Sequence, residues 1–162
     1  MSKNSSTLPL ERREGIFTAI SLGAFFILVG VIFATTPNLF EKIIAFFRNF
    51  DIVEVSGTGI FLPAPKSPWA HSTVYSAAAQ FSFGLGILQI LILALRLVAR
   101  SALNKTAETT SNLVFWFGTG YLVNMLLNET TTIRIWFAFW AGILVLIGIS
   151  MIIRAMILLA RR

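Results

Sequence analysis

The chain has no cysteine and a single histidine, His71, among its 162 residues. Without cysteine it can form no disulfide, thiolate metal site, iron–sulfur cluster or cysteine nucleophile. Other metal-ligating groups are sparse too, because none of the seven acidic residues lies inside a long apolar stretch. A metal site or a catalytic triad needs several such groups together. We therefore expect no catalytic residue, metal or cofactor, and an enzyme is the weaker class of function.

Charged residues are also scarce, at 12% of the chain against roughly 25% in an ordinary soluble domain. Hydrophobic residues make up 56% and are concentrated in four long stretches. Each stretch approaches the ~20 residues with which a helix crosses the hydrocarbon core. The first is longer than the core of a signal peptide, so we expect it to be retained. The sequence predicts an all-α integral membrane protein, one domain over 1–162, with transmembrane helices at about 15–35, 72–98, 111–128 and 133–158.

Basic residues gather at alternate ends of the predicted helices, and cytoplasmic connections usually hold the excess. We expect a multi-pass protein of the cell membrane with both termini cytoplasmic. In this topology 1–14 is a flexible cytoplasmic leader and 36–71 is extracytoplasmic. Basic residues in ones and twos at helix ends contact lipid headgroups and do not indicate nucleic-acid binding. The nine expected inside are Lys3, Arg12, Arg13, Arg96, Arg100, Lys105, Arg154, Arg161 and Arg162, and the four expected outside are Lys42, Arg48, Lys66 and Arg134.

The connection 36–71 is the only long one. Its first part, about 38–50, has apolar residues at helical spacing, and its 13 residues are too few to span a bilayer. It is predicted to be an amphipathic helix lying in the outer interface. The second part, 51–71, is irregular, and its Ser56-Gly57-Thr58-Gly59 segment allows a short β-hairpin. Covering the outer end of the helices is its plainer role, and a functional loop is the alternative.

The second predicted helix is the most polar, and an amide inside hydrocarbon needs a partner within the protein. Because the third predicted helix runs antiparallel to it, Asn124 should lie near the depth of Gln80. We predict a hydrogen bond between these two side chains. Polar residues at seven-residue spacing form a further stripe along the second helix. Together they define a candidate polar seam in a four-helix bundle, which is either packing or a pathway: Gln80, Asn124, Gln89, Ser82, Tyr75 and Arg96.

A second candidate site lies in the outer loop. His71 and Trp69 precede the second predicted helix, and Asp51 and Glu54 lie earlier in the same loop. A lone histidine needs partners before it can act as a catalyst or a ligand. We therefore interpret His71 first as a residue of the interface or of the helix end.

The sequence favours a non-catalytic membrane protein, a small subunit or scaffold. Its partners would be membrane lipids and either other membrane proteins or further copies of itself. The alternative is an oligomeric channel or small-solute transporter whose pathway is lined by the polar seam. The predicted helices hold no acidic or basic residue away from their ends, which weighs against it. A third hypothesis is a lipid-binding or lipid-modifying protein that uses the outer loop around His71.

Overall fold

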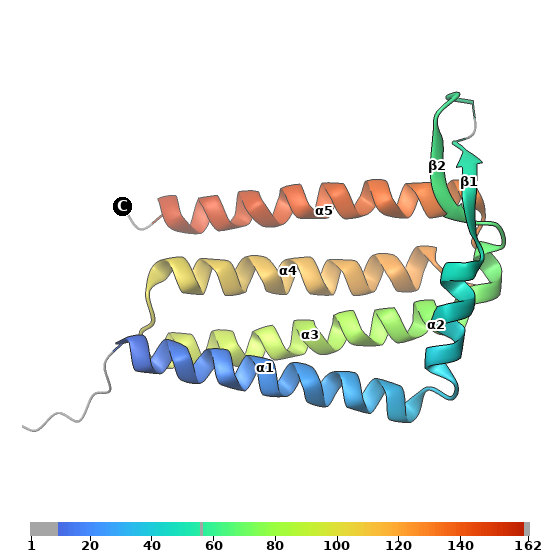
Figure 1. Ribbon diagram of the computed structural model, residues 1–162. Coiled ribbons are helices and arrows are strands. Elements are labelled where there is room, and N and C mark those ends of the chain that lie inside the picture. Colours follow the sequence, from blue (N-terminus) through green and yellow to red (C-terminus); the bar gives the residue numbers. More distant parts are fainter. Residues whose placement is uncertain (1–9, 56, 161–162) are drawn as a thin grey trace, which may run out of the picture.

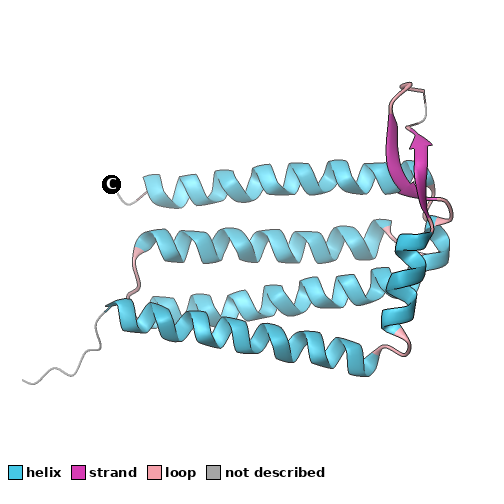
Figure 2. Ribbon diagram, viewed as in Figure 1, coloured by secondary structure: helices cyan, strands magenta, loops and turns pink. Residues whose placement is uncertain are grey.

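The computed structural model describes residues 10–55 and 57–160 and is 78% helical (Figures 1 and 2). Helix α1 begins at Leu10, so the last residues of the predicted leader are helical, and 1–9 lie outside the described residues. A two-stranded sheet follows the second helix. The elements are α1 (Leu10–Thr35), α2 (Leu39–Arg48), β1 (Phe50–Glu54), β2 (Phe61–Pro65), the short 3₁₀ helix η1 (Pro68–His71), α3 (Ser72–Val98), α4 (Leu103–Leu126) and α5 (Ile133–Leu159).

Three helical segments are long and apolar enough to cross a membrane. They are Gly15–Thr35 in α1, Pro68–Val98 in η1 and α3, and Ile133–Leu159 in α5. The structure thus supports three of the four predicted spans by length and composition. The remaining long helix, α4, starts at Leu103 and not near 111, and its first half is polar. The protein is therefore mainly helical, and its three long apolar helices suggest that it is a membrane protein.

Helix α4 can start earlier than predicted because the hydroxyl groups of its threonines donate hydrogen bonds to backbone carbonyl groups of the same helix. Thr109 Oγ1 donates to the carbonyl oxygen of Lys105 at 2.9 Å, and Thr110 Oγ1 donates to that of Thr106 at 3.0 Å. Such bonds to the preceding turn let hydroxyl side chains sit on a helix without a further partner. A prediction based only on the length of the apolar stretch leaves these polar residues out, although the helix includes them.

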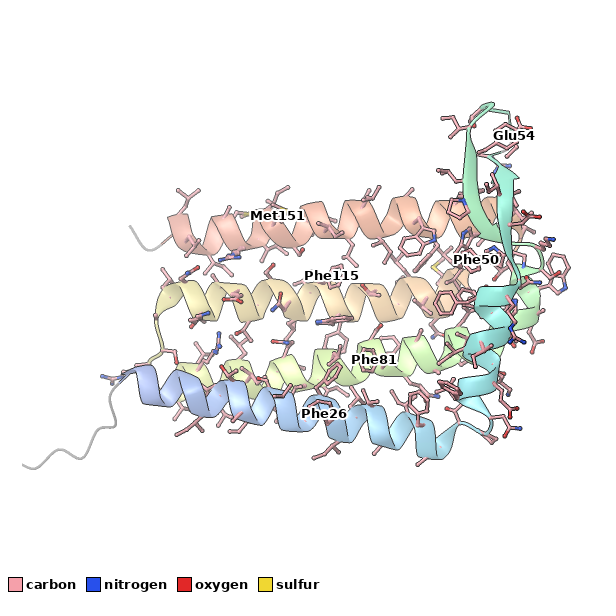
Figure 3. All side chains as sticks on the ribbon, in the orientation of Figure 1. Phe26, Phe50, Glu54, Phe81, Phe115 and Met151 are labelled. Carbon is pink, nitrogen blue, oxygen red and sulfur yellow. The ribbon has the colours of Figure 1, made fainter. Side chains whose placement is uncertain are left out.

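The four long helices form a row in which each runs antiparallel to the next (Figure 1). Helix α3 packs on α1 and α4, and α4 packs on α3 and α5, with α3 on α4 the most extensive contact. The predicted four-helix bundle is not confirmed, because α1 and α5 lie at opposite edges of this row. Both carry large apolar side chains that point away from the protein, such as Phe26 and Met151, which are 63% and 66% exposed (Figure 3).

The two ends of the row differ. Helix α2, the hairpin and η1 cover one end, called the hairpin end here, and the other end holds the start of α1 and the end of α5 (Figure 1). Helix α2 is amphipathic as predicted, but it ends at Arg48 because Phe50 already belongs to β1. Its buried Leu39 packs with Ile32 of α1 and Ala77 of α3. The cover is therefore tied to the ends of the long helices.

The short hairpin anticipated in 51–71 is present, and its conformation is defined by the pairing of its strands and by its turn. Strand β1 pairs antiparallel with β2, with Phe50 opposite Pro65 and Glu54 opposite Phe61. Gly57 and Gly59 take φ angles of 76° and 68° in the turn, a region that favours glycine. Two prolines are tolerated in β2 because a two-stranded sheet consists of edge strands.

Candidate functional site

A polar pocket of about 550 Å³ opens at the hairpin end, where α1 and α4 end and α3 begins. Gln80 of α3 and Asn124 of α4 both line it, so the sequence placed them at one depth correctly. The predicted hydrogen bond between them is absent from the described part of the chain, although both residues line the same pocket. We call this site the polar pocket, and it is lined by Thr35, Thr36, Pro37, Ser72, Thr73, Ser76, Gln80, Asn124, Leu127, Asn128 and Glu129.

Charges of both signs lie at the polar pocket. Lys42 of α2 reaches over the start of α3, where its Nζ donates to Thr73 Oγ1 at 3.3 Å. Glu129, in the turn after α4, contributes a carboxylate to the lining. Asn128 holds that turn, because its Oδ1 accepts from the backbone N–H of Thr130 at 2.8 Å. The pocket therefore offers a cation at one side, a carboxylate in its wall and neutral hydroxyls and amides between them.

The other members of the predicted seam do not line this pocket. Ser82 is buried and donates to the carbonyl oxygen of Ala78 at 2.8 Å. Gln89 is half-buried further along α3, and Tyr75 is buried among aromatic rings. Two residues along a helix correspond to about 200° of rotation, so Ser82 lies nearly opposite Gln80. The seam is thus divided between two sides of α3.

Arg96 lies at the other end of α3, where it takes part in a group of hydrogen bonds between helices that the sequence did not lead us to predict. Its Nη1 donates to Thr109 Oγ1 of α4 at 2.8 Å and to the carbonyl oxygen of Lys105. On the other side of α4, Ser111 Oγ donates to the carbonyl oxygen of Ser150 of α5 at 2.8 Å. The sequence feature that could have indicated these hydrogen bonds is the high density of Thr, Ser and Asn between 104 and 112. Polar side chains at such spacing serve as contacts between helices in membranes.

The Ser111–Ser150 bond gives a direct test of this helix contact. Ser111→Ala is expected to lower the free energy of unfolding by about 1 kcal/mol, the usual net contribution of an intramolecular hydrogen bond. Thr110→Val is the matched control, because the Thr110 hydroxyl bonds only to its own helix. Unfolding of both variants in mixed micelles, followed by circular dichroism, compares them. Equal losses would show that the bond from α4 to α5 contributes nothing of its own.

Of the outer-loop residues predicted as a second site, Asp51 and Glu54 lie in strand β1 of the hairpin, and Trp69 and His71 lie in η1. Lys66 Nζ lies 3.1 Å from Asp51 Oδ2, and the backbone N–H of Ile52 together with this ammonium lowers the pKa of Asp51. Glu54 lies near the tip of the hairpin (Figure 3), where its Oε1 accepts from the backbone N–H of Gly59. Trp69 is half exposed, at 51%. Asp51 and Glu54 are engaged within the hairpin and its flank and do not gather around His71, whereas Trp69 lies in η1 with His71.

His71 instead belongs to an aromatic cluster at the hairpin end. The ring of Phe46 is at its centre, with its centroid 5.2 Å from that of His71 and 6.0 Å from those of Tyr75 and Trp136. This arrangement joins α2, α3 and α5 through edge-to-face ring contacts. We define the aromatic cluster as Phe46, Phe50, His71, Tyr75, Trp136 and Phe139.

Within residues 10–55 and 57–160, no three His, Cys, Asp or Glu side chains come close enough to hold a metal ion. The polar pocket is thus the site with the most chemistry to offer, and that chemistry is hydrogen bonding and charge pairing. Comparison of the chain with models of known protein families, with curated proteins and with solved structures gives no match.

Proposed function

We propose that the protein is a four-span, non-catalytic subunit or scaffold of the cell membrane that binds a partner helix through α1. Helix α4 would be the fourth span. Its 24 residues correspond to about 36 Å of helix, and it lies between α3 and α5. Thr109, Thr110 and Ser111 of its polar first half bond to neighbouring helices or to carbonyl groups of α4 itself, as hydrocarbon surroundings require. The excess of basic residues at the end opposite the hairpin supports cytoplasmic termini.

The observation that carries this proposal is a difference between two sets of glycines. Those of α3 and α4, and Gly142 of α5, are in contact with a neighbouring helix. For example, an added Cβ would lie 2.5 Å from Leu28 at Gly84 and 2.7 Å from Phe117 at Gly86. At Gly23 and Gly30 of α1, an added Cβ would meet no described atom within 4 Å.

The two open glycines share one side of α1. They are seven residues apart, about two helical turns, and Ala19 lies one turn before Gly23. This side faces away from α3, which α1 contacts through residues such as Leu28. Small residues on a membrane helix let a second helix approach closely. Since every glycine of α3 and α4, and Gly142 of α5, is used in that way, a helix of a partner subunit or of a second copy best explains the open side of α1.

The test is the double substitution of Gly23 and Gly30 by leucine. The variant is expected to fold but to lose its partner, because two large side chains would keep the second helix away. Pull-down from native membranes, together with the mass of the purified detergent complex, measures the association. We expect at least about a tenfold loss of associated partner, which corresponds to 1.4 kcal/mol.

Gly148→Leu is the matched control, because Gly148 of α5 also meets no described atom within 4 Å. It should leave the association unchanged and should not lower the thermal stability, because leucine favours helix over glycine. The proposal would be refuted by a wild-type protein that purifies only as a monomer with no co-purifying protein. Unchanged association of the double variant would refute the role of α1.

The channel or transporter alternative has one observation in its favour, the polar pocket. It is less well supported, because the remaining seam residues, from Tyr75 to Arg96, do not extend that pocket through the row. Flux through reconstituted vesicles that is lost in Gln80→Leu would favour it over a scaffold.

A further inference from the structure

An apolar groove between α1 and α3 lies next to the polar pocket along these two helices, and the two hollows have no lining residue in common. This groove has a volume of about 270 Å³ and is lined by Ala24, Ile27, Leu28, Val31, Gly84, Ile87, Leu88 and Leu91. On α3, Thr73, Ser76 and Gln80 line the polar pocket, and Gly84, Ile87 and Leu91 line the groove. Spacings of three and four residues keep all six on one side of the helix. A single side of α3 thus changes from polar to apolar at Gly84.

The facing wall changes in the same way. Thr35 of α1 lines the polar pocket, and Val31 and Ile27, one and two turns earlier, line the apolar groove. The two hollows therefore share both helices as walls and follow one another along the row. From Gln80 in the polar pocket to Leu91 in the apolar groove, the two hollows extend along α3 for about 16 Å. Its polar part lies at the ends of the helices, at the level of lipid headgroups, and its apolar part lies deeper.

The polar end suits a headgroup that carries both charges. A phosphate would accept hydrogen bonds from the ammonium of Lys42 and from nearby hydroxyls such as that of Ser76. An ammonium group would donate to the carboxylate of Glu129 and to amide oxygens. None of the described lining residues is aromatic, whereas quaternary ammonium groups are usually bound by aromatic rings. The chemistry favours a primary ammonium over a choline.

We propose that the polar pocket and the apolar groove together bind one phospholipid with a phosphoethanolamine headgroup. The headgroup occupies the polar pocket, with its phosphate at Lys42 and Thr73 and its ammonium at Glu129. One acyl chain lies in the apolar groove, against Val31, Ile87 and Leu91. The site is independent of the partner helix proposed above, because Gly23 and Gly30 do not line it.

The headgroup is tested with the full-length protein reconstituted in vesicles of equal phosphatidylethanolamine and phosphatidylcholine. After extraction, native mass spectrometry counts the lipids that stay bound. We expect one lipid per chain, with ethanolamine preferred about tenfold, the contribution of one charge-assisted hydrogen bond. Glu129→Gln should reduce this preference to within about twofold. Glu41→Gln removes an acid of α2 that does not line the polar pocket and should leave the preference unchanged.

The acyl chain is tested by filling the groove. Ile87→Trp is expected to lower the bound lipid at least about tenfold. Ile152→Trp is its control, because Ile152 lies on α5 and is 60% exposed, close to the 55% of Ile87. Soluble phosphoethanolamine, which has the headgroup and no chain, should displace the lipid only at far higher concentration.

Three outcomes would overturn the proposal. The first is a wild-type protein that retains no lipid or retains both lipids equally. The second is an equal effect of Glu129→Gln and Glu41→Gln on the headgroup preference, or of the two tryptophan variants on lipid retention. The third is displacement of the lipid by soluble phosphoethanolamine at equal concentration, which would mean that the groove holds no chain.

Discussion

Replacing Trp136 by alanine is expected to lower the free energy of unfolding by about 3 kcal/mol, near the low end for removal of a buried tryptophan. Trp136 is 4% exposed, and its ring lies 5.9 Å from that of Phe50 and 6.0 Å from that of Phe46. It also contacts Tyr75. The substitution removes ring contacts from α2, β1 and α3 at once, and the cavity left among rigid rings cannot easily close.

Trp140→Ala is the matched control for this substitution. Trp140 lies one turn further along α5 and is 50% exposed, so its loss should cost less than about 1 kcal/mol. Thermal unfolding in detergent, followed by circular dichroism, compares the two variants. Limited proteolysis adds a local measurement, because loosening of α2 and β1 should speed cleavage in the hairpin turn near Gly57 only in Trp136→Ala. Equal stability losses would mean that the aromatic cluster does not hold the hairpin end together.

Much of the order of elements along the chain could be predicted, because it follows from local patterns. Long apolar stretches predict α1, α3 and α5 to within a few residues, except that α1 begins at Leu10. The periodicity of α2 is visible because its two sides face different surroundings. Glycines between short β-prone runs predict the hairpin, and glycine is the residue that positive φ angles favour.

The packing of the helices could not be predicted in the same way. In lipid the outside of a helix is as apolar as its buried side, so the sequences of α1 and α5 do not reveal which side meets a neighbour. A bundle and a row therefore fit the same apolar pattern. The row differs from a bundle in that, among the described residues, α1 packs on α3 without an extensive contact with α5, and such contacts depend on side chains of other helices.

The candidate site was predictable in part for related reasons. Gln80 and Asn124 share a depth because antiparallel helices of known ends must align, and both line the polar pocket. The pocket itself also depends on where α1 ends and where Glu129 lies, which no local pattern gives. The grouping of Asp51 with His71 failed because the hairpin register brings Asp51 to Lys66 instead.

The contact between α3 and α4 gives the second large effect. Gly86→Leu is expected to lower the free energy of unfolding by about 3 kcal/mol, the upper part of the usual range for overpacking. A Cβ at this position would lie 2.7 and 2.8 Å from two ring atoms of Phe117. That ring cannot swing away freely, because it packs against Phe83 with a centroid distance of 6.2 Å. The helices must therefore separate along their most extensive contact.

A compensating substitution makes the cause of this loss measurable. In a background of Phe117→Ala the space is vacated, so Gly86→Leu should cost at least about 1 kcal/mol less than in the wild-type protein. Gly148→Leu supplies the baseline, because its side chain would meet no described atom within 4 Å and leucine favours helix over glycine by most of ~1 kcal/mol. Unfolding in mixed micelles yields the four free energies of the cycle. If Gly86→Leu costs the same with and without the Phe117 ring, the approach of α3 to α4 does not depend on the absence of a side chain at Gly86.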